Sequence, residues 1–198
     1  SDVCSSDLLL AKIFTPEEAV LAADLLPEME PPAQISTRLG RDMRELAGML
    51  KEMSKKGLIS VGKTAEGRLG FGLMPFVVGI YEAQIDRIDA ELAKLFEDYY
   101  QKSFATSLRV TPQVHRVIPV RVAVKNDTEV APFESVSALV DRMQSWGVID
   151  CICRTQKALI GDPCQHPVDV CMVLSEKPDA FSSDGTVTPL DRQGAINT

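Results

Sequence analysis

Apolar residues recur every three or four positions through the first third of the chain, the spacing of helices that each bury one face. Thr15 precedes Pro16 and two glutamates, which together predict a helix N-terminus. Gly40 marks a turn, Asp42 is a helix cap, and Gly57 is a typical residue after a helix end. Three helices are therefore predicted, over residues 15–26, 33–39 and 42–57.

Two short apolar segments follow these helices and are predicted to be strands. They cover residues 58–61 and 69–73 and flank a turn over 63–67. Three helices followed by a hairpin is the order of a winged helix-turn-helix. We therefore predict an N-terminal winged-helix-like domain over residues 9–78, without a motif that would specify a family.

A regular apolar repeat then runs over residues 81–99. Its members are spaced alternately four and three apart: Tyr81, Ile85, Ile88, Leu92, Leu95 and Tyr99. This spacing predicts a long linking helix over residues 79–105 with a seam like that of a coiled coil. The seam predicts either a homodimer through 81–99 or packing against the chain's own domain, and the spacing alone favours neither.

The second half alternates between short helical and strand patterns. Residues 114–124 alternate as a strand does, and a helix from about 132 is predicted by Val136, Val140 and their neighbours. Gly147 is expected just after that helix, and residues 148–152 are expected to form a buried strand. These elements predict a small α/β cysteine-cluster domain over residues 106–198, so the expected fold class of the whole chain is α+β.

Four cysteines lie close together in this second half. They are Cys151, Cys153, Cys164 and Cys171, spaced C-x-C-x10-C-x6-C. A tight local set in a chain without a secretion signal favours a metal site over disulfides. Four thiolates suit either tetrahedral zinc or an iron–sulfur cluster, and the single-residue gap of the first pair favours the cluster.

The local pattern predicts how the four thiols would converge. Cys151 and Cys153, two residues apart on the predicted strand, would face the same side. Pro167 would begin another helix, with Cys164 just before it and Cys171 about one turn into it. Three neighbours are predicted to support the cluster, by offsetting thiolate charge or by hydrogen bonding: Arg154, Lys157 and His166.

The segment CICRTQKALIGDPCQHPVDVC, residues 151–171, resembles the C-x-C-R…G-x-x-C-x-x-P-x-x-x-C segment of a prokaryotic family of [4Fe-4S] ferredoxin-type proteins. The preceding RVIPV at 116–120 is similar too. The resemblance covers about 112–196 well and the first half loosely. It implies that the four cysteines bind a [4Fe-4S] cluster for redox chemistry. In that family a helix-turn-helix-like region often precedes this segment and ferredoxin motifs often follow, so we expect a C-terminal truncation here.

Basic residues gather in the predicted winged-helix region. Residues 36–68 hold eight basic and four acidic side chains. The basic residues are candidates for phosphate contacts: Arg38, Arg41, Arg44, Lys51, Lys55, Lys56, Lys63 and Arg68. A solvated helix face on a protein-interaction module is the alternative, and we favour DNA binding less than that.

Composition and the motifs that are absent narrow the classes of function that the sequence favours. The net charge of −7 argues against broad binding to nucleic acid or anionic membranes, and no apolar stretch is long enough to span a bilayer. Residues 1–8 match the translation of a sequencing-adapter end, so we expect a non-native leader that includes Cys4. No hydrolase triad order, HExxH, P-loop or dinucleotide motif is present, so electron transfer or redox sensing is more probable than catalysis.

The sequence thus predicts a cytoplasmic iron–sulfur protein that passes electrons to a partner oxidoreductase or a downstream ferredoxin domain. Two alternatives remain open at this point. One is a redox-responsive regulator that binds DNA through the winged helix, and the other is a structural zinc module.

Overall fold

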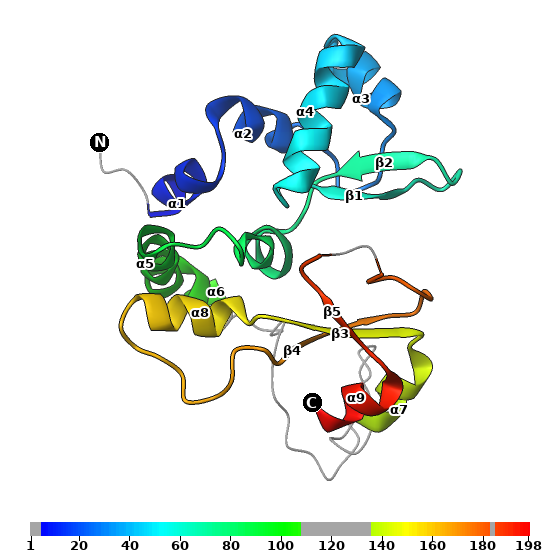
Figure 1. The fold of residues 1–198 in the computed structure, drawn as a ribbon. Helices are drawn as coiled ribbons and strands as arrows, with labels where there is room; N and C mark the ends of the chain where they lie inside the picture. The colour runs from blue at the N-terminus through cyan, green and yellow to red at the C-terminus, as the bar shows by residue number, and fades with distance from the viewer. Residues whose placement is uncertain (1–4, 108–135, 183–184) are drawn as a thin grey trace. The chain divides into compact units, whose positions relative to one another are not determined.

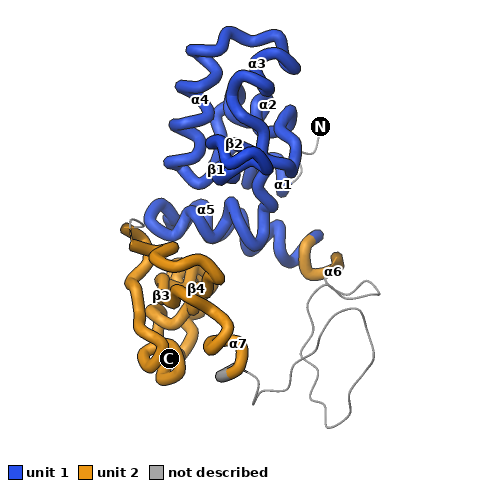
Figure 2. Tube along the Cα trace, turned by 90° about the vertical axis from the view of Figure 1, so that its right-hand side faces the viewer, with its two compact units in different colours: residues 1–103 blue, residues 104–198 orange. Residues whose placement is uncertain are grey.

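The structure, a computed structural model, describes residues 5–107, 136–182 and 185–198. Helices and small antiparallel sheets occur together, which confirms the expected α+β class. The chain divides into two compact units, residues 1–103 and 104–198 (Figure 2). The strand expected over 114–124 and the cysteine at position 4 lie outside the described residues. Within the described ranges, no helix has the length and apolar character needed to cross a membrane.

Four helices open the first unit (Figure 1). They are α1 Ser5–Ile13, α2 Pro16–Ala23, α3 Pro32–Leu39 and α4 Met43–Lys55. The Thr15 side chain accepts a hydrogen bond from the Glu18 N–H, and the Glu18 side chain accepts one from the Thr15 N–H, so α2 begins where its cap predicts. Asp42 caps α4 by accepting hydrogen bonds from two first-turn N–H groups. The expected non-native leader overlaps α1, whose first turn includes residues 5–8.

A two-stranded hairpin follows α4 directly. It comprises β1 Ser60–Lys63 and β2 Leu69–Gly72, which pair antiparallel with Lys63 opposite Leu69. Gly67 closes the turn with a φ of +77°, a backbone region that glycine enters at little cost. The backbone of Glu30 extends this sheet by pairing with Phe71 through bonds of 3.0 and 2.9 Å. The segment between α2 and α3 is thereby joined to the hairpin.

One apolar core holds these elements together. The helices contribute the side chains that lie on their inner faces, and the start of the hairpin segment contributes two more. The fully buried members include Leu21, Ile35, Leu46, Leu50, Met53, Leu58 and Ile59. Their spacing along α4 is that of a single helix face, as the sequence predicts.

The single long helix expected over 79–105 is not present. The chain instead has the segment η1 Phe76–Ile80, whose residues 77–79 have non-helical backbone angles, and then the short turn η2 Glu82–Gln84. The elements α5 Ala90–Tyr99, η3 Tyr100–Phe104 and α6 Ala105–Ser107 follow. The break falls at Asp89, whose backbone is extended and whose carboxylate accepts the Leu92 N–H at 2.7 Å. That hydrogen bond, together with Lys12, holds the pKa of Asp89 below its ordinary value. An aspartate that can cap a new helix therefore interrupts the repeat.

The apolar repeat packs inside the first unit. Tyr81 is buried and stacks on Phe96 with ring centroids 3.6 Å apart and planes 7° apart. Phe76 adds an edge-on contact to Tyr99 at 5.9 Å. Helix α5 also packs against α1, where Lys12 forms ion pairs with Asp89 and Glu91. Of the six residues of the repeat, two are buried within the first unit and four are half-buried, and the homodimer through 81–99 stays a prediction.

The second unit is built on a three-stranded antiparallel sheet (Figure 1). The order of its strands is β4–β3–β5, with β3 in the centre. The elements are α7 Val136–Arg142, β3 Ser145–Ile149, α8 Ile152–Leu159, β4 Cys171–Ser175, β5 Thr188–Leu190 and α9 Arg192–Asn197. Helix α9 is tied to α7 by an ion pair between Arg192 and Asp141 at 2.5 Å.

Gly147 lies within the central strand, and its expected position after a helix is wrong. Helix α7 ends at Arg142, and β3 then begins at Ser145. Gly147 faces Val173 on one side and Pro189 on the other. A Cβ at this position would lie 2.4 Å from the Val187 Cγ1 atom, so the two flanking chains approach too closely for a side chain. Close strand packing is therefore the reason for this glycine.

Candidate metal centre

Cys151 lies at the junction of β3 and α8. Its N–H donates to the Val168 carbonyl at 2.8 Å, and its carbonyl accepts from the N–H groups of Arg154 and Thr155 at 3.1 and 3.0 Å. Cys151 is thus the N-cap residue of α8, and Cys153 lies in the first turn of that helix. The expectation that both cysteines lie on one strand is wrong, because β3 ends at Ile149.

The reason for the early helix is visible in its buried side chains. Ile152 and Gln156, four residues apart, are each about 4% exposed. That spacing places both on the inner face of α8, where their burial stabilises the helix. Cys151 is left half-buried and Cys153 exposed.

Cys171 begins strand β4 instead of lying in a helix. It pairs with Ile149 of β3, and the strand continues to Ser175. Residues 161–170 form no helix, so the helix expected from Pro167 is wrong. Cys164 is exposed in this connection, which leaves α8 through Gly161 at a φ of +83°. Cys171 lies in a strand and not in a helix because residues 171–175 pair with all five residues of β3.

The backbone nevertheless brings the two cysteine-bearing segments together. Three contacts join residues 149–154 to residues 167–171: the Ile149–Cys171 pairing, the Cys151 N–H bond to Val168, and a hydrogen bond from the Arg154 guanidinium to the Pro167 carbonyl. Cys164 lies three residues before Pro167. These contacts therefore join the segments that carry Cys151, Cys153 and Cys171, and none of the four cysteines forms a disulfide.

The side chains of this neighbourhood are not arranged as a closed metal site. Among the described residues, no three His, Cys, Asp or Glu side chains are grouped so as to hold a metal ion. The chemistry of the donor set suits a four-thiolate centre, because four cysteines lie within residues 151–171.

The three residues expected to support the cysteines occupy different positions. Arg154 is bonded to the Pro167 carbonyl, so it fixes the connection to α8. Lys157 lies 3.6 Å from the Asp162 carboxylate, in an ion pair at the end of the same helix. His166 is exposed on the connection between Cys164 and Pro167.

The basic residues of the first unit divide into two groups. Arg38 and Lys56 are engaged within the unit. Arg38 forms two hydrogen bonds to the buried Glu30 carboxylate, at 3.1 and 2.5 Å, and hydrogen bonding to Glu30 raises the pKa of the guanidinium. Lys56 lies 2.6 Å from the Glu18 carboxylate. These two side chains stabilise the fold instead of presenting charge to a partner.

The remaining basic residues are turned outward, with Arg41 intermediate. Arg44, Lys51 and Lys55 are exposed on α4, and Lys63 and Arg68 are exposed on the hairpin. Two of them have acidic neighbours, Lys55 with Glu52 at 2.7 Å and Arg68 with Glu66 at 3.8 Å. Arg41 is half-buried, with its guanidinium 3.7 Å from the Met49 sulfur.

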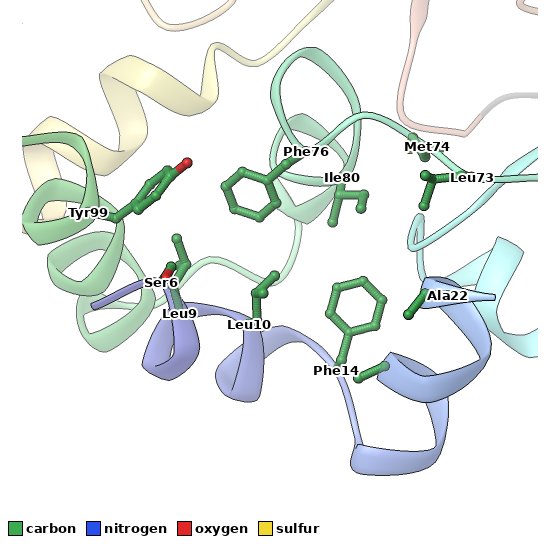
Figure 3. A pocket seen from close by; sticks show the side chains of 12 residues that line it. Ser6, Leu9, Leu10, Phe14, Ala22, Leu73, Met74, Phe76, Ile80 and Tyr99 are labelled. Atoms are coloured by element: carbon green, nitrogen blue, oxygen red, sulfur yellow. The ribbon is translucent and has the colours of Figure 1, made fainter. Parts of the chain in front are cut away.

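A cavity of about 370 Å³ lies within the first unit, between α1, α2, η1 and α5. Its wall is almost wholly apolar, and Figure 3 shows Tyr99 and Ser6 at one end, with Phe14 and Ala22 at the other. Apart from Tyr99 no lining residue is titratable, so the cavity can admit an apolar group but offers little for acid–base chemistry. No sequence pattern predicts it, because the wall comes from four separate segments of the chain.

Comparison of the chain with family models, with curated proteins and with solved structures found no match. The structure defines an α+β chain of two units. The first has a hairpin after four helices, and the second has a small antiparallel sheet with four cysteines in α8, in β4 and in the segments that flank them.

Proposed function

We propose that this chain is an iron–sulfur protein whose second unit binds a [4Fe-4S] cluster through Cys151, Cys153, Cys164 and Cys171. The observation that supports the proposal is the contact between the segment that carries Cys151 and Cys153 and the segment that ends at Cys171. Cys164 lies on the connection between them. The resemblance of this segment to ferredoxin-type proteins supports iron over zinc. A structural zinc module is the competing assignment.

Each ligand would come from a different local structure. Cys151 and Cys153 lie at the N-terminus of α8. Cys171 is held by the sheet, and Cys164 lies on the connection that Arg154 fastens to α8. A bound cluster would supply one-electron transfer. The protein would supply the four thiolates and the N–H donors that set its potential.

The partner we propose is an oxidoreductase or a ferredoxin domain. Exposed Cys153 and Cys164 favour this role, because electrons move between centres that approach closely at a surface. We also propose that the first unit is a winged-helix-like domain. Its support is the order α2, the Glu30 bridge, α3, α4, β1 and β2, which matches the three helices and hairpin of that fold.

Anaerobic reconstitution of the full chain with iron and sulfide tests the cluster. The expected result is a brown protein with broad thiolate-to-iron absorption and with iron and sulfide in equal amounts. Cys→Ala at any of the four positions should remove most of the iron, because an open iron corner is labile. Cys4→Ala is the matched control and should leave iron unchanged. A colourless protein with stoichiometric zinc would instead establish the zinc module.

A further inference from the structure

The outward face of α4 carries a line of basic residues that the core does not use. This line consists of three basic residues and one glycine: Arg44, Gly48, Lys51 and Lys55. They are spaced four, three and four residues apart, so they lie along one side of the helix. All four are exposed, and the buried residues Leu46, Leu50 and Met53 occupy the opposite side. The line thus faces solvent along the whole helix.

Gly48 is the least expected member of this line. Glycine in a helix interior lowers helix stability relative to alanine. A Cβ at position 48 would meet nothing within 4 Å, so no contact within the chain requires its absence. A glycine at the centre of an exposed cationic line therefore points to a partner that approaches the helix backbone closely.

The β1–β2 hairpin provides further positive charge immediately after α4. Lys63 ends β1, and Arg68 stands just before β2, so the two exposed side chains flank the turn. Two acidic residues, Glu45 and Glu52, lie on α4, and Glu66 lies in the turn. Glu52 pairs with Lys55, and Glu66 pairs with Arg68. Arg44, Lys51 and Lys63 form no ion pair with another described residue, so they supply the positive charge of this surface in a chain of net charge −7.

We propose that the first unit binds duplex DNA, with the outer face of α4 in the major groove and the hairpin along the neighbouring phosphates. The major groove, roughly 12 Å wide, admits a helix, and a missing side chain at Gly48 lets the helix lie deeper in it. Arg44, Lys51 and Lys55 would contact phosphates or base edges. This inference goes beyond electron transfer and does not depend on the cysteines.

The proposal is tested by fluorescence anisotropy, with the full chain and mixed-sequence duplexes about two helical turns long. Binding is measured at a series of salt concentrations. The double variant Arg44→Ala/Lys51→Ala is compared with Lys94→Ala/Lys102→Ala, which removes the same charge from α5 and η3. The first pair should weaken binding at least tenfold and lower the salt slope by about two, whereas the second changes binding less than twofold. Equal losses in both pairs, or no salt-dependent binding by the unmodified chain, overturn the proposal.

Gly48→Gln separates close approach from simple charge attraction. The variant should melt at a higher temperature than the parent, because glutamine favours a helix, and yet bind the duplex at least tenfold more weakly. Unchanged binding would overturn the placement of α4 in the groove. Competition with polyglutamate is the second arm: if it displaces the duplex at equal charge concentration, the face recognises an acidic polypeptide and the DNA proposal fails.

Discussion

A single carboxylate, Glu18, joins the start of α2 to the end of α4. It completes the Thr15 cap and lies 2.6 Å from the Lys56 ammonium, with only 10% of its side chain exposed. Burial raises the pKa of Glu18, but the hydrogen bonds from Lys56 and Thr15 outweigh that effect and lower the pKa below 4.5. The ion pair therefore stabilises the fold where the carboxylate is charged.

Glu18→Gln should remove this charge while keeping the cap. We expect the free energy of unfolding at pH 7 to fall by about 1 kcal/mol. Because the folded-state pKa is lowered, the stabilisation is fully present above pH 4.5 and is lost as the pH falls further. Urea unfolding across pH should therefore show the two proteins converge in acid. The exposed neighbour Glu17→Gln is the control, and an equal loss there would contradict the assignment.

Arg38 was predicted as a candidate phosphate contact, but in the structure its side chain stabilises the fold. Its guanidinium holds Glu30, whose side chain is 5% exposed, and also donates to the Asp24 carbonyl at 2.9 Å. Arg38→Met would leave a buried carboxylate without its cation, and we expect the melting temperature to fall by roughly 5 °C or more. Lys51→Met should leave it unchanged. Thermal melts followed by circular dichroism compare the two, and equal melting temperatures would refute this role.

Elements with local capping signals are the ones that could be predicted from the sequence. Asp42 and Gly40 mark the start and end of helices α4 and α3 within one residue, because these signals act between neighbours. The apolar run from Val148 to Ile152 carried no such signal, since a short buried run suits strand and helix alike. Asp89 within the 81–99 repeat is also a residue type that can cap a helix. The regular apolar spacing around it nevertheless favoured the prediction of one continuous helix.

The packing of the 81–99 segment predicts how much it contributes to the stability of the first unit. Because Tyr81 stacks on Phe96 inside the unit, Phe96→Ala should destabilise the monomer by about 3 kcal/mol. Urea unfolding at two protein concentrations a hundredfold apart measures the loss. The midpoint of unfolding should not change with concentration for either protein. A midpoint that rises with concentration would show that the segment forms the homodimer instead.

Central strand β3 positions the cysteine segment, so its packing should affect metal uptake. Gly147→Val would force a side chain against Val187 and the Thr188 carbonyl, and we expect a loss of about 2–3 kcal/mol in the second unit. The chain's one tryptophan, Trp146, lies in β3 and reports this unfolding by its fluorescence. Gly185→Ala, where a Cβ meets nothing, is the control.

At the scale of the whole molecule, the four cysteines are close in sequence, so it could be predicted that they belong to the same part of the fold. Their spatial arrangement could not be predicted. The three contacts that join residues 149–154 to 167–171 depend on strand pairing, which periodicity does not specify. The roles of Arg38 and Lys56 likewise depend on acids 8 and 38 residues away, which charge counting does not reveal.

The division into two compact units predicts that cluster binding acts on only one of them. A ligand that binds the folded state stabilises the part whose folding creates its site, by an amount that grows with its affinity. Hydrogen exchange followed by mass spectrometry, before and after anaerobic reconstitution, should show at least tenfold more protection over residues 149–171. Helices α2 and α4 should keep their exchange rates, and Cys171→Ala should abolish the gain. Equal protection of both units would mean that they fold as one cooperative body, and protection of neither would remove the cluster from residues 151–171.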